Sequence, residues 1–123
     1  MSAFKKKRIL CVDDSEDDCL LFHLILTEEG YEVESARSFT VAVQLIEQKT
    51  FDLCLFDHFL RDGKGLDLLE RVRTVNSSMP IIICSGDVRA STQQKVIQSG
   101  AQAFFPKPID FDSLIEAIAQ FLD

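Results

Sequence analysis

The chain has 123 residues, 46% of them apolar, and a formal net charge of −7. This length predicts a single domain, residues 1–123 with a core at 5–122, and the negative charge argues against direct contact with nucleic acid. No apolar stretch approaches the roughly 20 residues that span a bilayer. The start, MSAFKKKRIL, lacks the apolar region of a signal peptide, so we expect a cytoplasmic protein with no membrane partner.

Short apolar runs alternate with helical patterns along the chain, which indicates βαβ units. Such units form a parallel sheet with helices on both faces, the α/β class. The runs ILCV, LCLF and IIIC are continuously apolar, as in strands buried on both faces. In chain order we expect a strand at Arg8–Val12, a helix at Glu16–Glu29, a strand at Glu32–Ala36, a helix at Phe39–Gln48, a strand at Asp52–Asp57, a helix at Gly65–Val75, a strand at Pro80–Ser85, a helix at Ala90–Gln98, a strand at Ala103–Phe105 and a helix at Phe111–Leu122.

Residues typical of helix ends support these boundaries. Ser15 and Asp18 have the S-x-x-[DE] spacing of a capping box at the first helix. Glu16, Asp17 and Asp18 fill its first turn, where the helix dipole favours negative charge, so we expect their neutralisation to cost little stability. Other helices have cap residues before them or glycines suited to a left-handed backbone after them: Ser38, Asp110, Gly30 and Gly100.

The cysteines show no pattern of a metal or disulfide site. They form no CxxC pair, and three of the four lie inside apolar runs, where a thiol behaves as a small buried hydrophobe. The two histidines add no ligand spacing typical of zinc. We therefore expect reduced thiols in the core and no zinc site for this set of residues: Cys11, Cys19, Cys54, Cys84, His23 and His58.

Polar residues stand at the carboxyl ends of the predicted strands. Asp13 and Asp14 follow the first strand, Asp57 ends the third, Ser85 ends the fourth and Lys107 follows the fifth. In an open parallel sheet these ends share one edge, where the ligand crevice forms. We therefore expect three carboxylates, one hydroxyl and one ammonium group to converge.

The charge of this group limits what it can do. Two carboxylates at 4 Å repel by about 4 kcal/mol at an effective dielectric of 20, and one lysine cannot offset three of them. The group must take up protons or hold a cation, and hard oxygen ligands suit Mg²⁺. A carboxylate beside Mg²⁺ can attack phosphorus and form an aspartyl phosphate. Lys107 and Ser85 would then bind the remaining phosphoryl oxygens.

Taken together in this order and spacing, these motifs resemble the response-regulator receiver domain of two-component signalling, of the chemotaxis-regulator type. The resemblance covers nearly all of the chain. It implies an α/β fold of the flavodoxin-like (βα)5 type, with a five-stranded parallel sheet in the order 2-1-3-4-5 and helices on both faces. The motifs are VDD at 12–14, FDLCLFD at 51–57, GLDLL at 65–69, IIICSG at 81–86 and GAQAFFPKP at 100–108.

The resemblance also implies a metal site and a phosphoacceptor. Asp57 would accept the phosphoryl group and ligate Mg²⁺. Asp14 would bind the ion directly and Asp13 through a water molecule. Phe59 would offer its backbone carbonyl to the ion.

Further roles follow for the switch residues. Ser85 would be the switch hydroxyl and Phe104 the switch aromatic. Lys107 would pair with the phosphoryl group, and the peptide bond between Lys107 and Pro108 would be cis, a minority form of X–Pro bonds.

This sequence departs from the family pattern after the acceptor. Leu60 and Arg61 replace the common Met-Pro pair, so we expect a more mobile loop. A bulky Phe59 would shield the acyl phosphate from water, which predicts slow self-dephosphorylation. Strand alternation turns His58 away from Asp57, so we expect it to be partly exposed and to have no metal role.

Two other positions near the switch also depart from the family pattern. Gly86 replaces the alanine that commonly follows the switch hydroxyl. Phe104 replaces the commoner tyrosine, so the switch has no phenol.

The first predicted helix is apolar almost all round, at CLLFHLIL from Cys19 to Leu26. A helix with a single buried face has a polar opposite face. Two interpretations stay open. The helix is deeply packed with a few exposed leucines, or it is a docking surface, through Leu20 and Leu24, for a phosphodonor helical bundle or a partner subunit.

The resemblance implies a signalling switch rather than an enzyme with turnover, one that catalyses its own phosphorylation and slow dephosphorylation. A sensor histidine kinase or a histidine phosphotransfer protein would donate the phosphoryl group to Asp57 with Mg²⁺. The surface of the fourth helix, fifth strand and fifth helix would then control an output protein or domain, and a homodimer is compatible with the sequence. Two alternatives stay open: a Mg²⁺-dependent phosphohydrolase with an aspartyl nucleophile, and a degenerate receiver that serves as a constitutive interaction module.

Overall fold

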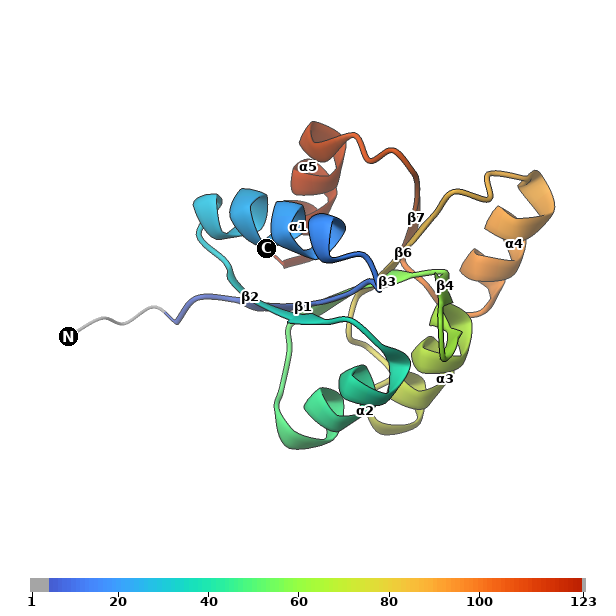
Figure 1. The fold of residues 1–123 in the computed structure, drawn as a ribbon, viewed down its shortest axis with the longest axis horizontal. Coiled ribbons are helices and arrows are strands. Elements are labelled where there is room, and N and C mark those ends of the chain that lie inside the picture. The colour runs from blue at the N-terminus through green and yellow to red at the C-terminus, as the bar shows by residue number, and fades with distance from the viewer. Residues whose placement is uncertain (1–4, 123) are drawn as a thin grey trace.

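The computed structural model describes residues 5–122. Within this range the chain forms a five-stranded parallel sheet (Figure 1). The strand order, β2-β1-β3-β6-β7, equals the predicted 2-1-3-4-5, because β6 and β7 are the fourth and fifth strands of this sheet along the chain. The predicted α/β fold is thus confirmed. The strands are β1 (Arg8–Val12), β2 (Glu32–Ala36), β3 (Leu53–Asp57), β6 (Ile81–Ser85) and β7 (Ala103–Pro106).

Helices cover both faces of the sheet, with α1 and α5 on one face and α2, α3 and α4 on the other (Figure 1). Because side chains alternate along a strand, Ile9 and Cys11 pack toward α1 and α5, whereas Leu10 and Val12 pack toward the other three helices. Element boundaries differ from the predicted ones by one residue at most. The helices in the described range are α1 (Glu16–Glu28), α2 (Phe39–Gln48), α3 (Gly65–Val75), α4 (Ala90–Gln98) and α5 (Phe111–Leu122).

Most predicted helix ends are confirmed. The Ser38 hydroxyl accepts the Val41 N–H over 3.1 Å. Gly30 and Gly100 have positive φ angles of 97° and 108°, which side-chain-bearing residues rarely adopt. Asp110 accepts hydrogen bonds from the Ser113 N–H and hydroxyl at the start of α5.

Two further findings concern the cysteines and the helix lengths. The four cysteines are buried and form no disulfide in the described part of the chain. Within residues 5–122, every helix is too short or too polar to cross a lipid bilayer.

The segment after β3 folds into a short antiparallel hairpin that the sequence pattern did not predict. The Asp62 carboxylate accepts the backbone N–H groups of Phe39 and Thr40, over 2.8 and 3.1 Å, at the start of α2. These hydrogen bonds, the one from Phe39 foremost, lower the pKa of Asp62. The contacts tie the segment to α2, while the expected mobility of the loop stays a prediction. Its two strands are β4 (Phe59–Leu60) and β5 (Gly63–Lys64).

Two glycines let this hairpin pack closely. A Cβ atom at Gly65 would lie 2.3 Å from the carbonyl oxygen of Asp57, and one at Gly63 would lie 2.6 Å from the ring of Phe39. The Gly65 N–H also donates to the His58 carbonyl oxygen over 2.8 Å. The start of α3 therefore lies directly against the backbone at the end of β3.

Candidate active site at the carboxyl edge of the sheet

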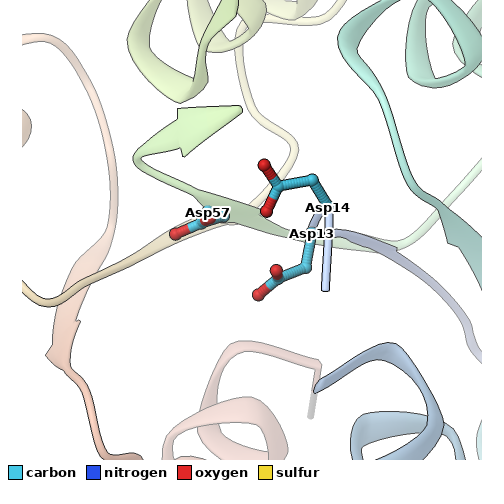
Figure 2. Close-up of side chains that lie close together, drawn as sticks. All are labelled: Asp13, Asp14 and Asp57. Atoms are coloured by element: carbon cyan, nitrogen blue, oxygen red, sulfur yellow. The ribbon is translucent and has the colours of Figure 1, made fainter. Parts of the chain in front are cut away.

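Three carboxylates meet where β1 and β3 end (Figure 2). Asp13 and Asp14 directly follow β1, and Asp57 is the last residue of the neighbouring strand β3. One side-chain oxygen of each residue lies within 4.8 Å of the others. Asp13 is buried, while Asp14 and Asp57 are partly exposed. This spacing of hard oxygen ligands at an open edge suits one small divalent cation that keeps several waters.

Lys107, just after β7, places its ammonium group among these carboxylates. Its Nζ lies 2.8 Å from Asp13 Oδ2 and 3.4 Å from Asp57 Oδ1. Burial by itself would lower the pKa of Lys107, but its hydrogen bond to Asp13 and the charge of Asp57 raise this pKa above the ordinary value. The lysine is therefore a fixed positive charge. The peptide bond from Lys107 to Pro108 is cis, as the family resemblance implies.

The uncompensated negative charge of this group affects the pKa of Asp57. Burial and the negative charge of Asp13 raise the pKa of Asp57 to about 6, against the lowering effect of Lys107. One lysine thus does not neutralise the cluster, and without a metal ion the carboxyl group of Asp57 takes up a proton in mildly acidic solution. A cation bound beside it would favour the ionised form. The donor set therefore fits Mg²⁺.

Only one of the two hydrogen bonds of the predicted capping box forms at the start of α1. The Ser15 hydroxyl accepts the Asp18 N–H over 3.2 Å, but Asp13 Oδ1, and not Asp18, accepts the Ser15 N–H over 2.9 Å. The Asp18 carboxylate instead accepts a hydrogen bond from Lys107 Nζ over 3.1 Å. Asp18 therefore contacts the lysine of the cluster as well as the start of α1, a contact that the capping and dipole roles expected from the sequence do not include.

Arg61, in the turn of the hairpin, is another residue that sequence reasoning missed. Its Nε lies 3.8 Å from Asp14 Oδ2, with the arginine side chain 85% exposed. No local pattern in the sequence signals this pair, because it depends on how the hairpin folds back toward β1.

Ser85, at the end of β6, is buried and by strand alternation shares the sheet face of Ile81 and Ile83, which α2, α3 and α4 cover. Its hydroxyl oxygen accepts the Asp87 N–H over 3.0 Å and lies 3.3 Å from His58 Nδ1.

The expectation that His58 is partly exposed is wrong, since only 6% of this residue is exposed. Burial lowers the pKa of His58. Its imidazole lies beside Ser85 and lines a pocket together with Asp87 and two residues of α4, Thr92 and Lys95.

Phe59 and Asp87 contact His58 and Ser85, respectively. Phe59 is half-exposed, and its ring centroid lies 4.2 Å from that of His58. The Asp87 carboxylate is bound by both Arg89 nitrogens Nε and Nη2, over 2.9 and 2.7 Å, which, with other hydrogen bonds, lowers the pKa of Asp87 well below its ordinary value. Phe104 is partly buried and packs against the core on the α2, α3 and α4 face.

Residues 9–119 match the family model described as the response regulator receiver domain. The chain belongs to this family. Among its relatives, the alginate biosynthesis transcriptional regulatory protein AlgB of Pseudomonas putida is 35% identical over 116 residues, and the transcriptional regulatory protein ZraR of Klebsiella oxytoca is 32% identical over 114 residues. These matches cover 94% and 93% of this chain. The chain spans about a quarter, 26%, of the length of each relative.

Solved receiver structures agree in fold. A CheY-like response regulator receiver domain protein from Methanospirillum hungatei superposes with a TM-score of 0.91 at 35% identity, covering 97% of this chain and 95% of that one. The response regulator TrrA of Thermotoga maritima, solved in complex with Mg²⁺-BeF, superposes with a TM-score of 0.85 at 27% identity, covering 94% of this chain and 99% of that one. The family and fold predictions are thus confirmed, while the roles of individual site residues stay predictions.

Proposed function

We propose that this receiver domain is a phosphorylation-controlled switch that accepts a phosphoryl group on Asp57. The main support is the position of the Asp57 carboxyl group, which lies within 4.8 Å of two further carboxylates and 3.4 Å from a lysine ammonium group. Its raised pKa indicates unbalanced negative charge around it. Such a group is suited to attack phosphorus when a divalent cation balances the charge.

Mg²⁺ would be held by Asp13, Asp14, Asp57 and the backbone carbonyl of Phe59. When bound, the ion neutralises charge on the phosphoryl group as it transfers. The complex of TrrA with Mg²⁺-BeF supports this choice of metal. Lys107 is placed to pair with a phosphoryl oxygen on Asp57, since its Nζ already lies beside that carboxylate.

The new charge on Asp57 would act on the Ser85 hydroxyl and then on Phe104. A phosphoryl group adds about −1.5 to −2 charges at one point, which is sufficient to bias two packings that differ by a few kcal/mol. Ser85 and Phe104 lie on the adjacent strands β6 and β7. We expect the surface formed by α4, β7 and α5 to report the change to an output protein or domain.

The phosphodonor would be a sensor histidine kinase or a histidine phosphotransfer protein that docks on α1. Leu20 and Leu24 are 56% and 57% exposed on this helix. A cavity of about 440 Å³ lies between α1 and the segment before α5 and reaches Lys107; it is lined by Asp18, Leu21, Phe22, Lys107, Pro108, Ile109 and Phe111. Apolar side chains around the lysine of the site are what a donor helix would need in order to approach Asp57.

The phosphohydrolase alternative has less support. It requires a general acid or base beside Asp57, and the imidazole of the neighbouring His58 contacts Ser85 instead. The degenerate receiver is disfavoured because the acidic residues and Lys107 are all present. The relatives are named as transcriptional regulators, and this chain spans 26% of their length. Because its net charge is −7, we propose that it does not itself contact nucleic acid.

Incubation with Mg²⁺ and a small acyl phosphate or amidophosphate tests the proposal. We expect one phosphoryl adduct that is stable in acid and labile in base, and that is lost in Asp57→Asn and in the presence of a chelator. An adduct that survives in Asp57→Asn would contradict the proposal, and repeated hydrolysis of a phosphate ester would favour the phosphohydrolase. The decay of the same adduct measures its lifetime, which we expect to shorten when Phe59→Asn removes the shielding ring.

A further inference from the structure

Two groups of the described chain lie within hydrogen-bonding distance of the Ser85 hydroxyl oxygen. Among residues 5–122 these partners are the Asp87 N–H and His58 Nδ1, at 3.0 and 3.3 Å, and Asp57 is not one of them. Ser85 is 1% exposed and His58 is 6% exposed. Water therefore does not replace either contact freely, and the serine side chain has a defined orientation before any phosphoryl group is present.

His58 is itself fixed by several contacts. Its backbone N–H donates to the Cys84 carbonyl oxygen over 2.9 Å, and its carbonyl oxygen accepts the Gly65 N–H over 2.8 Å. The ring lies against that of Phe59, with centroids 4.2 Å apart. The imidazole therefore holds its place opposite Ser85 while the serine, with its single χ1 torsion, is the part that can turn.

We propose that His58 is a positioning residue that holds the Ser85 hydroxyl away from Asp57 and so opposes the switch. This inference rests on the proposed function, because it concerns the step in which Ser85 moves toward a phosphoryl group on Asp57. A hydroxyl that turns to that side leaves His58 Nδ1, and a buried polar group that loses its partner disfavours the new state. His58 thereby favours the resting orientation of Ser85.

The test uses fluoroberyllate with Mg²⁺ as a stand-in for the phosphoryl group, and the midpoint of binding as the measured quantity. His58→Phe keeps an aromatic ring but removes Nδ1, whereas His58→Asn keeps a polar atom near the Nδ1 position. We expect His58→Phe to bind about fivefold more tightly than the wild type, which corresponds to about 1 kcal/mol. We expect the binding midpoint of His58→Asn to stay within about twofold of the wild-type value.

A double-mutant cycle separates this role from a structural one. In Ser85→Ala the hydroxyl is absent, so adding His58→Phe should leave the binding midpoint unchanged. A gain of the same size in the Ser85→Ala background would overturn the inference, as would an unchanged or weaker midpoint in His58→Phe alone. If the wild type bound no fluoroberyllate at saturating Mg²⁺, the proposed function and the inference would both fall.

A second measurement needs no phosphoryl mimic and no variant of His58. The ¹⁵N spectrum of the imidazole ring reports the hydrogen bond at Nδ1 in the resting protein. We expect the Nδ1 resonance of His58 to shift in Ser85→Ala, and not in Ser99→Ala, whose hydroxyl donates to Lys95 on α4. An Nδ1 resonance that is the same in the wild type and in Ser85→Ala would overturn the inference.

Discussion

Asp57 combines two demands that oppose each other. As the proposed nucleophile it must be ionised, yet burial and the charge of Asp13 raise its pKa to about 6. Lys107 reduces this effect but does not remove it. The resting site therefore disfavours its own reactive form until a cation is bound, which makes the carboxyl group dependent on the metal.

The raised pKa predicts how stability depends on pH without metal. Between pH 3.8, the ordinary pKa, and about 6, the unfolded chain loses the proton of Asp57 while the folded protein keeps it, so the free energy of unfolding falls as pH rises. We expect the metal-free wild type to lose about 1 kcal/mol relative to Asp57→Asn across this window, after allowance for solvent screening. Urea unfolding of both proteins measures this.

At neutral pH without metal, we expect the wild type to be less stable than Asp57→Asn. Saturating Mg²⁺ should make the wild type the more stable of the two. The ion binds only the folded site, so it stabilises the wild type more than Asp57→Asn, which lacks one charged ligand. Parallel stability curves for the two proteins, with and without the ion, would contradict our account of the charge balance.

The contact between Asp18 and Lys107 could not be predicted from the local sequence motif around Asp18. The S-x-x-D spacing is that of a capping box, but the lysine that binds Asp18 lies 89 residues further along the chain. By contrast, the meeting of Asp13, Asp14, Asp57 and Lys107 could be predicted, because strand ends in a parallel sheet share one edge. Contacts between helix, hairpin and strand end could not, since they depend on side-chain orientations that periodicity does not encode.

Asp17 provides a matched control for Asp18. Both lie in the first turn of α1, but of the two only Asp18 forms an ion pair with Lys107 within the described structure. We expect Asp18→Asn to lower the free energy of unfolding by about 0.5–1 kcal/mol more than Asp17→Asn, because it loses a half-buried ion pair as well as the dipole contribution. Equal effects in chemical unfolding would show that the pair adds nothing to stability.

At the scale of elements, the main strands and helices followed from apolar runs and caps, whereas the β4–β5 hairpin did not. Its strands have two residues each, too few for an alternating pattern to be visible. Its position is set by the hydrogen bond that the Asp62 carboxylate accepts from the Phe39 N–H at the start of α2, and by the close approach of Gly65 to Asp57. This small element connects the end of β3 with α2 and α3.

Gly65→Ala tests that connection. The added Cβ atom would lie 2.3 Å from the Asp57 carbonyl oxygen, which is backbone and cannot move aside cheaply. We expect a loss of about 1–3 kcal/mol in the free energy of unfolding, together with weaker Mg²⁺ binding. Gly86→Ala is the control, because no atom lies within 4 Å of its added Cβ, and we expect a change within about 0.5 kcal/mol. Equal stability of the two variants would contradict the close contact.

At the scale of the whole molecule, the start of α1 lies beside the carboxylate cluster, and the exposed Leu20 and Leu24 follow on the same helix. Helix α1 begins beside Asp13 and Asp14, and its Asp18 contacts the lysine of the site. A partner that covers α1 would therefore also cover the approach to Asp57. This arrangement favours the interpretation of α1 as a docking surface over that of a deeply packed helix with a few exposed leucines.

Polar substitution of both leucines tests the docking surface. We expect Leu20→Gln with Leu24→Gln to slow phosphotransfer from a histidine phosphotransfer protein by about tenfold, the loss of roughly 1.4 kcal/mol of docking free energy. Labelling by a small acyl phosphate should be unchanged. Val75→Gln, at a 75% exposed position on α3, is the control. Unchanged phosphotransfer and an unchanged oligomeric state would exclude α1 as an interface.

The most direct test of the central claim is the location of the phosphoryl group. After incubation with Mg²⁺ and a small acyl phosphate, reduction with borohydride converts a phosphorylated aspartate to homoserine, which peptide mapping by mass spectrometry places in the sequence. We predict that the modification is found at residue 57 and depends on Mg²⁺. Modification at another residue, or none at residue 57 in a protein that retains its fold, would contradict the assignment of Asp57 as the phosphoacceptor.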